Sequence, residues 1–147
     1  RFIGERAAFS QTLQKQIAEA EALTFNNKAM TLNIAANYGG QWDILNAIKK
    51  IGARIERGEI SSDSIGQRML ESELSLAETP DPDLFIRTGG EHRVSNFLLW
   101  QLAYTEFYFT DVLWPDFSTE EMQKSLNDYA KRQRRYGKTS DQVVEVK

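Results

Sequence analysis

The spacing of apolar residues along this chain switches between a helical period and a strand period, and that alternation limits the folds open to it. A helical stripe comes first, formed by Phe9, Leu13, Ile17, Ala20 and Leu23. From Met30 to Tyr38 every second residue is apolar, which is the period of a strand. Helices and strands that alternate at these lengths predict an α/β fold, in which a mostly parallel sheet carries helices on both faces.

The same periods predict the other elements. Gly39-Gly40 ends the first long strand and begins a second helix, which Gly58 ends. The apolar stripe of this helix is Ile44, Ile48, Ile51 and Ile55. The remaining expected elements are a short helix capped at 61–63, a strand over 83–88, a buried helix over 96–104, a strand over 106–110 and a last helix that begins at the capping box of 118–121.

The composition excludes several kinds of site. The chain has 147 residues, 41% of them hydrophobic, which suits one globular domain or a large part of one. It contains no cysteine and a single histidine, His92, so disulfides, thiolate chemistry and sites built from two imidazoles are excluded. The longest apolar run is 97–100 and the formal net charge is −3, so we expect neither a membrane span nor a surface that binds nucleic acid as a whole.

Paired glycines directly follow two of the expected strands. They stand in Asn37-Tyr38-Gly39-Gly40 and in Arg87-Thr88-Gly89-Gly90. Ligands of open parallel sheets bind beyond the carboxyl ends of the strands, and glycine lets backbone N–H groups approach an anion there. Neither segment matches a nucleotide-binding fingerprint, and simple turn formation is the alternative interpretation of both.

Polar side chains cluster around the second glycine pair. Arg87, His92, Arg93 and Ser95 supply two guanidinium groups, an imidazole and a hydroxyl within nine residues. Because arginine binds phosphate oxygens in a bidentate manner, two arginines around a glycine turn with a serine nearby indicate a diphosphate site. The alternatives are surface salt bridges for the arginines and a solvated loop position for His92.

Glu106 lies among aromatic residues at the start of the last expected strand. One interpretation is a carboxylate that faces the same cleft, where a hard cation bridging phosphates would bind it. The other interpretation is a carboxylate on an edge strand that faces water. The sequence pattern leaves both open.

Four segments of the chain together resemble the cis-prenyltransferases. Two of them carry the expected phosphate site, in residues 83–101 (DLFIRTGGEHRVSNFLLWQ), and the aromatic segment, in residues 106–117 (EFYFTDVLWPDF). The other two are residues 1–4 (RFIG) and 33–40 (NIAANYGG), and the resemblance extends to about Gly137. It implies an α/β enzyme that encloses a hydrophobic tunnel and uses Mg²⁺ to condense isopentenyl diphosphate onto farnesyl diphosphate with cis geometry. The expected product is undecaprenyl diphosphate, the precursor of the lipid carrier for cell-wall glycan synthesis.

The resemblance also assigns roles to residues of this chain. Arg87, Arg93 and Ser95 are expected to hold the diphosphate of isopentenyl diphosphate, and Glu106 is expected to bind magnesium. The other residues expected at the substrates are His92, Val94, Asn37, Arg135 and Gly137. The last two belong to a C-terminal Arg-x-Gly motif that reaches into the site of a partner subunit.

The expected tunnel lies along the strand of 30–38. Met30 occupies the position that lines the far end of the tunnel in the family. The residues expected beside it on the same apolar face are Leu32, Ile34 and Ala36. These side chains would accommodate the growing hydrocarbon.

The family pattern includes an N-terminal segment that this sequence does not contain. In the family, a catalytic and metal-binding aspartate lies in an Asp-Gly-Asn-Gly-Arg-Trp segment, which is absent here. The chain also opens without an initiator methionine, and residues 1–4 are typical of the end of a strand. We therefore expect residues 1–147 to be the C-terminal part of a single cis-prenyltransferase domain, inactive alone, with its catalytic residue outside this chain.

The resemblance further implies a cytoplasmic homodimer that associates with the periphery of the membrane, toward which it releases its product, and no nucleic-acid partner. Two alternatives stay open. A non-catalytic accessory subunit of a heteromeric cis-prenyltransferase would keep the fold, but such subunits degrade the positions that Arg87, Arg93 and Ser95 occupy here. An RNA-binding module would rest on the cations of 131–138 alone, without a stacking platform or a known motif.

Overall fold

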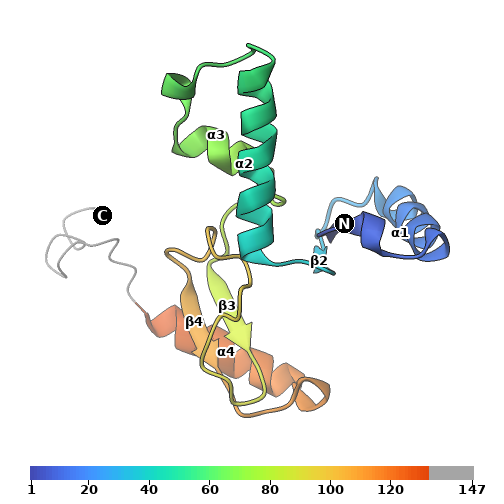
Figure 1. Cartoon of the computed structure of the whole chain (residues 1–147). Coiled ribbons are helices and arrows are strands. Elements are labelled where there is room, and N and C mark those ends of the chain that lie inside the picture. The colour runs from blue at the N-terminus through green and yellow to red at the C-terminus, as the bar shows by residue number, and fades with distance from the viewer. Residues whose placement is uncertain (133–147) are drawn as a thin grey trace, which may run out of the picture. The chain divides into compact units, whose positions relative to one another are not determined.

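The chain forms two compact units, each of which contains one pair of parallel strands. The structure is a computed structural model that describes residues 1–132 (Figure 1). The first unit contains Arg1–Pro80 and Asn96–Trp100, and the second contains Asp81–Ser95 and the residues from Gln101 onward. Helices mixed with parallel strands confirm the predicted α/β class, although the expected single sheet is, in the described part of the chain, two sheets of two strands each.

The strands of the first unit are short. β1 (Phe2–Ile3) pairs in parallel with β2 (Ile34–Ala35), with Phe2 beside Ile34 and Ile3 beside Ala35. The strand predicted at the start of the chain is confirmed, whereas the strand predicted over 30–38 keeps only two residues. A strand extends only as far as a neighbour completes its hydrogen bonds, and β1 offers two residues.

The apolar face expected to line a tunnel is open in the described residues. Met30, Leu32 and Ile34 are 77%, 62% and 40% exposed, and Ala36 is half-buried. Burial of a strand face requires a second layer packed against it, and residues 1–132 place none over these side chains. The tunnel therefore remains a prediction for a longer protein.

Both predicted helical stripes form helices, α1 (Gln11–Thr24) and α2 (Gly40–Glu56). The hydroxyl of Ser10 caps α1 by accepting from the N–H of Leu13 at 3.3 Å. In α2 the predicted apolar stripe is only partly covered, since Ile51 is buried and Ile48 is 52% exposed. Periodicity therefore located the helices but overestimated how much of each face is buried.

α3 (Gln67–Glu73) packs against α2 within the first unit. The prediction of one short helix from 61–63 is wrong, because the segment divides into a 3-10 turn over Ser62–Ser64 and α3. Ile65 between them is extended, and Gly66 forms the N-cap of α3. The hydroxyl of Ser61 does accept from the N–H of Asp63 at 3.3 Å, but it caps the 3-10 turn and not α3.

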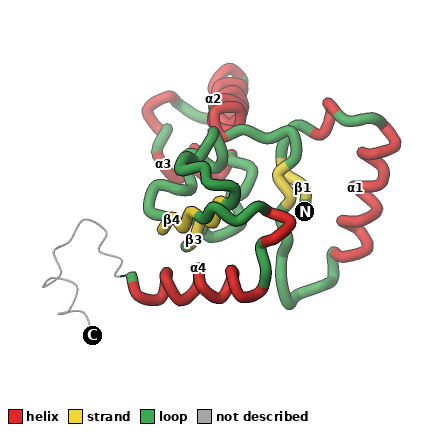
Figure 2. The backbone as a smooth tube through the Cα atoms, turned by 90° about the horizontal axis from the view of Figure 1, so that it is seen from below, coloured by secondary structure: helices red, strands yellow, loops and turns green. Residues whose placement is uncertain are grey.

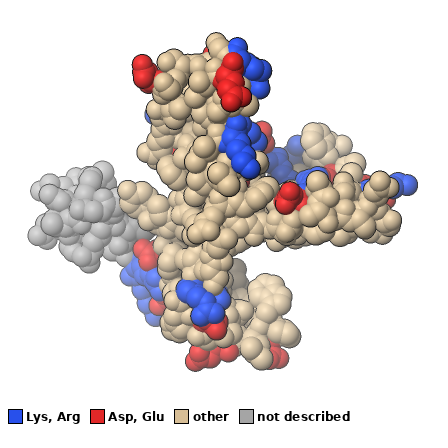
Figure 3. Space-filling model, viewed as in Figure 1, with Lys and Arg blue, Asp and Glu red and all other residues tan. Residues whose placement is uncertain are grey.

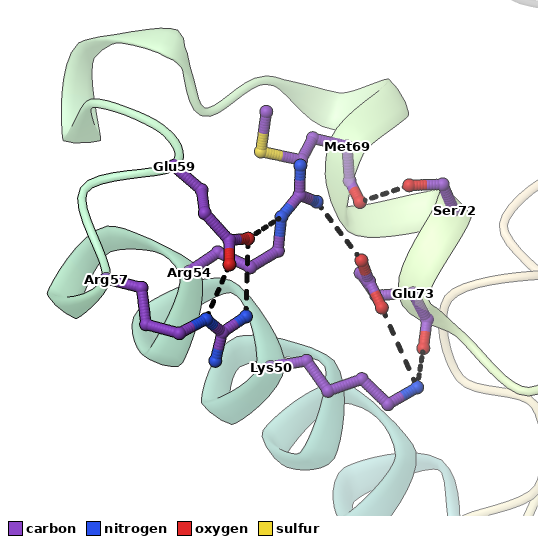
Figure 4. A network of polar contacts seen from close by, with 7 residues as sticks. All are labelled: Lys50, Arg54, Arg57, Glu59, Met69, Ser72 and Glu73. Carbon is purple, nitrogen blue, oxygen red and sulfur yellow. Dashed lines mark hydrogen bonds and ion pairs between the residues drawn. The ribbon is translucent and has the colours of Figure 1, made fainter.

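Ion pairs connect the end of α2 to α3 (Figure 4). Glu73 lies 3.3 Å from Nη1 of Arg54 and 3.7 Å from Nζ of Lys50. Nε of Arg54 also lies 3.7 Å from Glu59, which Arg57 binds through two nitrogen atoms. Ion pairs near the surface contribute up to about 1 kcal/mol each, so this network is a modest addition to the packing of the two helices.

The second unit pairs β3 (Leu84–Arg87) in parallel with β4 (Glu106–Phe109), as predicted. The rings of Phe85 and Phe107 meet edge to face, with centroids 5.3 Å apart. α4 (Thr119–Lys131) packs against β4, and Figure 2 shows the helix beside the strand pair. The predicted start of α4 is confirmed, because the hydroxyl of Ser118 accepts from the N–H of Glu121 at 3.4 Å.

The buried helix predicted over 96–104 is wrong. The segment is a series of turns in which Asn96 and Leu98 have φ values of 63° and 46°, and Ser95 just before it has a φ of 52°. Left-handed backbone of this kind cannot continue a right-handed helix. The apolar pattern nevertheless predicted burial correctly, since Leu98 and Leu102 are each 6% exposed.

Charged side chains of both signs are dispersed over the surface drawn in Figure 3, in keeping with the small net charge.

None of the helices within residues 1–132 combines the length and the apolar character needed to cross a membrane.

Candidate functional site

The carboxyl end of β3 holds the first residue of the predicted phosphate site. Arg87 is the last residue of β3 and lies beside Phe109 in the register with β4. Its backbone carbonyl accepts from the N–H of Thr110 at 3.0 Å, which fixes the main chain from which the side chain extends. Parallel sheets bind their ligands at this end of the strands.

The side chains of Arg87, Arg93 and Ser95 meet around one hydroxyl group. Nη1 of Arg87 donates to Oγ of Ser95 at 2.8 Å, and Nε of Arg93 donates to the same oxygen at 3.1 Å. Nη1 of Arg87 also donates to the backbone carbonyl of Arg93. The structure thus brings together the three residues expected to hold a diphosphate, and we call these three residues the clamp.

The clamp concentrates positive charge at a place that a ligand can reach. Arg93 and Ser95 are exposed, and Arg87 is half-buried. Glu91 contacts Nη1 of Arg93 and neutralises part of this charge. Because guanidinium groups bind two oxygens of a phosphate in parallel, a diphosphate would engage both arginines at once and could displace the single carboxylate of Glu91.

The amides of the glycine turn beside the clamp donate hydrogen bonds to backbone carbonyls of the same unit. The N–H of Gly89 donates to the carbonyl of Val112 at 2.9 Å, and the N–H of Gly90 donates to the carbonyl of Thr110 at 3.0 Å. Both glycines have positive φ values, of 84° and 74°, which favour glycine over other residues. The turn interpretation is therefore confirmed for this pair, and we expect anion contacts from the side chains of the clamp.

His92 and Val94 alternate with the clamp residues in the sequence but have other surroundings. The imidazole of His92 stacks on Phe109, with ring centroids 5.0 Å apart and an interplanar angle of 20°. Val94 is half-buried. The substrate contacts expected of His92 and Val94 remain predictions.

The turn after β2 is closed by contacts within the first unit. Asn37, which has a φ of 49°, accepts from the N–H of Glu5 at 3.1 Å and donates from Nδ2 to the carbonyl of Glu5 at 3.3 Å. The N–H of Gly40 donates to the carbonyl of Asn96 at 2.7 Å, and the N–H of Gln41 donates to Oδ1 of Asn96 at 2.9 Å. Asn96 thus occupies the amides of Gly40 and Gln41 at the start of α2, which supports the turn interpretation of the first glycine pair.

Asp43, in the first turn of α2, is a buried acidic residue that no sequence motif singled out. It is 2% exposed and accepts from the hydroxyl of Tyr38 at 2.9 Å and from the N–H and hydroxyl of Ser75 at 3.0 and 2.6 Å. Burial, together with the hydrogen bond to Asp43, raises the pKa of the Tyr38 hydroxyl. Ser75 lies 32 residues from Asp43 in the sequence, so no local pattern could have indicated this contact.

Glu106 lies at the opposite end of the strand pair from the clamp. It is the first residue of β4 and lies beside Leu84, the first residue of β3, whereas Arg87 is the last residue of β3. Oε2 of Glu106 accepts from Nη1 of Arg132 at 2.9 Å, and Arg132 also donates to Asp128. The structure therefore does not bring Glu106 together with the clamp.

The described residues do not by themselves fit a magnesium ion. Mg²⁺ requires an octahedral set of oxygen ligands, whereas Glu106 is a single carboxylate that Arg132 already binds. Within residues 1–132 no group of three or more histidine, aspartate or glutamate side chains could hold a metal. Further ligands would have to come from outside the described part of the chain.

Arg135 and Gly137, expected to reach into the site of a partner subunit, lie outside the described residues. Their contribution therefore stays a prediction.

Comparisons with known proteins establish the family and the fold of this chain. The sequence pattern of a family described as "Putative undecaprenyl diphosphate synthase" matches residues 1–137. The ditrans,polycis-undecaprenyl-diphosphate synthase ((2E,6E)-farnesyl-diphosphate specific) of Pseudomonas putida is 52% identical over 143 residues, which cover 97% of this chain and 57% of that protein. The synthase of the same name from Escherichia coli K12 is 50% identical over 139 residues, which cover 95% of this chain and 55% of that protein.

A solved structure shows the same fold. The lavandulyl diphosphate synthase of Lavandula x intermedia, in complex with dimethylallyl diphosphate, superimposes with a TM-score of 0.90 at 42% sequence identity. The match covers 93% of this chain and 59% of that one. The fold is therefore that of the cis-prenyltransferases. The chain belongs to the undecaprenyl diphosphate synthase family, and it spans little more than half the length of the curated relatives it matches.

Proposed function

We propose that the full-length protein, meaning this chain together with the N-terminal portion that the family resemblance implies, condenses isopentenyl diphosphate onto farnesyl diphosphate with cis geometry. The product would be undecaprenyl diphosphate, the precursor of the lipid carrier for cell-wall glycan synthesis. The observation that carries the proposal is the convergence of Arg87 and Arg93 on the hydroxyl of Ser95, at the carboxyl end of a parallel strand in a member of this family.

The clamp would bind the diphosphate of isopentenyl diphosphate and orient its double bond. Two guanidinium groups offer paired N–H donors to phosphate oxygens. The hydroxyl of Ser95 accepts from both arginines and keeps its own O–H proton, which it can donate to a third phosphate oxygen. Fixing one substrate in this way turns the meeting of two molecules into a reaction within one complex, which lowers its barrier. His92, Val94 and Asn37 are proposed to complete the pocket around the substrates.

The hydrocarbon of the growing product would lie along the open apolar face of the first unit. Its members are Met30, Leu32, Ile34 and Ala36. Three of these side chains are exposed in the described residues, which supports the need for a further layer to cover them. We propose that the N-terminal portion supplies this layer and closes the tunnel.

Magnesium is the proposed cofactor of the full-length protein. Bound to a diphosphate, Mg²⁺ neutralises charge on a departing group. We propose that Glu106 contributes one ligand and that the aspartate expected in the N-terminal portion contributes another. Binding at Glu106 would bring Mg²⁺ close to the guanidinium group of Arg132, which now contacts Oε2.

The remaining proposals concern assembly and location. We propose that residues 1–147 form the C-terminal part of one domain and that two such proteins form a homodimer. Arg135 and Gly137 would reach the substrates bound by the partner subunit. The protein would work in the cytoplasm, at the periphery of the membrane that receives its product.

An elongation assay tests the proposed function. Full-length protein is incubated with Mg²⁺, farnesyl diphosphate and radiolabelled isopentenyl diphosphate, the product is sized by thin-layer chromatography, and its double bonds are assigned by NMR. We expect a polyprenyl diphosphate of undecaprenyl length whose new double bonds are cis. Trans double bonds would contradict the proposal, and activity that appears only after a second, different subunit is added would favour an accessory role.

A further inference from the structure

Asn96 directly follows Ser95 of the clamp and is held at two atoms. Its carbonyl accepts from the N–H of Gly40 at 2.7 Å, and its Oδ1 accepts from the N–H of Gln41 at 2.9 Å. The first N–H groups of a helix have no partner within the helix, so these two bonds satisfy two of the free donors of α2. Asn96 therefore caps α2 from 55 residues away in the sequence, as measured from Gln41.

The glycine pair at the start of α2 makes this approach possible. A Cβ atom on Gly39 would lie 2.6 Å from Nδ2 of Asn96. A Cβ atom on Gly40 would lie 2.7 Å from Cγ and 2.8 Å from the backbone nitrogen of Leu99. Separations this short would force the segment 96–99 away from the helix. Because glycine has no Cβ atom, the glycine pair allows residues 96–99 to pack closely against the start of α2.

The backbone at the end of the clamp adopts a conformation that needs support. Ser95, Asn96 and Leu98 all have positive φ values, and none of them is glycine. Such residues persist only where surrounding contacts fix them, and they concentrate at sites that hold ligands. Asparagine tolerates this region better than most residues, and here its side chain also supplies one of the fixing contacts.

We propose that Asn96 is a positioning residue for the clamp. By binding the amides of Gly40 and Gln41, it fixes the backbone that places the hydroxyl of Ser95, on which the two arginines converge. The ligand of the clamp is taken from the proposed function, and the proposal deepens that function by adding a residue that acts through Ser95. The hydrogen bonds of Asn96 to the amides of Gly40 and Gln41 are observed in the structure and do not depend on the proposed function.

Loss of this contact has a specific kinetic consequence. A shift of about 1 Å in a group that orients a substrate can lower a rate by roughly 100-fold. Binding of isopentenyl diphosphate, the substrate held by the clamp, should be weakened, whereas binding of farnesyl diphosphate should not change. Replacement of Asn96 should therefore raise the KM for isopentenyl diphosphate and leave the KM for farnesyl diphosphate unchanged, a split that general loss of stability would not produce.

Four variants of the full-length protein separate positioning from folding. Asn96→Ala removes Oδ1, whereas Asn96→Asp keeps an acceptor of the same shape that suits the positive end of a helix. Gly40→Ala introduces the clash with Leu99. Gly52→Ala, also within α2, is the matched control, because a Cβ there would meet no atom within 4 Å.

Two measurements are made on each variant, steady-state kinetics with both substrates and hydrogen–deuterium exchange of backbone amides. Asn96→Ala and Gly40→Ala should raise the KM for isopentenyl diphosphate roughly 10- to 100-fold and speed exchange at residues 40–41 and 95–98. Asn96→Asp and Gly52→Ala should behave like the wild type in both measurements.

Three outcomes would overturn the proposal. They are an unchanged KM for isopentenyl diphosphate in Asn96→Ala, an equal rise in both KM values, and faster exchange confined to residues 40–41. If the wild-type protein shows no turnover, the proposed function fails. Hydrogen–deuterium exchange then decides the proposal. Faster exchange at residues 95–98 in Asn96→Ala supports the positioning role, and unchanged exchange there refutes it.

Discussion

The guanidinium group of Arg132 joins Glu106, at the start of β4, to Asp128 in α4. Its Nη1 lies 2.9 Å from Oε2 of Glu106, and its Nε lies 2.9 Å from Oδ2 of Asp128. Hydrogen bonds to Glu106 and then to Asp128 raise the pKa of Arg132, so it stays charged across the accessible pH range. A metal ion at Glu106 would thus share the carboxylate with a permanent cation.

Replacement of Glu106 by glutamine tests its proposed role toward magnesium. The shape of the side chain is kept, so the fold should be kept, while the charge that attracts the metal is lost. Loss of an outer-sphere partner typically costs 10- to 100-fold in metal affinity, and loss of a ligand should cost at least about as much. A titration of activity with Mg²⁺ should therefore shift to concentrations at least roughly tenfold higher.

Asp128→Asn provides the matched control for that titration. It removes a charge that also binds Arg132, but it leaves the Glu106 carboxylate intact. If the Mg²⁺ titration of Glu106→Gln is unaltered, or if both variants shift equally, Glu106 does not bind magnesium and only contacts Arg132.

Replacements of Met30 test the proposed tunnel. Met30 is 77% exposed in the described residues, so smaller or larger side chains there should not disturb the packing around it. Met30→Ala should let longer polyprenyl chains accumulate, and Met30→Trp should stop elongation early, because the thioether would contact only a long product. The first condensation should proceed at nearly the wild-type rate in both.

Product length is measured by thin-layer chromatography of radiolabelled product, with isopentenyl diphosphate in excess. Met122→Ala in α4 is a control, since Met122 is also partly exposed but lies outside the proposed tunnel. The same product distribution in all variants would make Met30 an ordinary apolar residue.

The raised pKa of the Tyr38 hydroxyl predicts that the protein loses stability at alkaline pH. Burial and the hydrogen bond to Asp43 raise the pKa of its hydroxyl above the ordinary value of 10.0. The folded state therefore holds this proton more tightly than the unfolded state does. The resulting stabilisation is complete below about pH 10 and is lost as the pH rises through the pKa of the folded state.

Urea unfolding of wild type and Tyr38→Phe, measured from pH 8 upward, checks this expectation. The phenylalanine variant should be less stable at pH 8 by roughly 1–2 kcal/mol, because Asp43 loses a buried donor. The difference should shrink as the pH rises above about 10. A constant difference would show that the hydroxyl does not titrate with folding, and Tyr108→Phe serves as a control for the other tyrosines.

The sequence predicted those features of the fold that depend on short-range patterns. Periodicity located α1, α2 and β3, and a cap motif located the start of α4. The helix expected over 96–104 failed because the apolar pattern reports burial and does not report backbone conformation. Asn96, which has a φ of 63°, binds the amide of Gly40 at the start of α2, a partner that is distant in the sequence.

The clamp was predictable in membership but not in geometry. Two arginines and a serine around a glycine turn indicated an anion, and the structure brings them together. The contacts of Asn96 and Asp43 were not predictable, because their partners lie 55 and 32 residues away. Glu106 was expected to face the same cleft, yet the register with β3 places it at the other end of the strand pair.

The clamp is the proposed site for the diphosphate of isopentenyl diphosphate, and one binding measurement tests this role directly. Isothermal titration calorimetry compares wild-type, Arg93→Ala and Arg68→Ala full-length proteins, with Arg68 as an exposed arginine of α3 outside the clamp. Loss of a charge-assisted bond to an anion costs about 1.5–3 kcal/mol, so Arg93→Ala should raise the Kd for isopentenyl diphosphate roughly 10- to 100-fold. Arg68→Ala should leave it unchanged, and neither variant should alter the Kd for farnesyl diphosphate. An unchanged Kd for isopentenyl diphosphate in Arg93→Ala, or equal losses for the two substrates, would contradict the account.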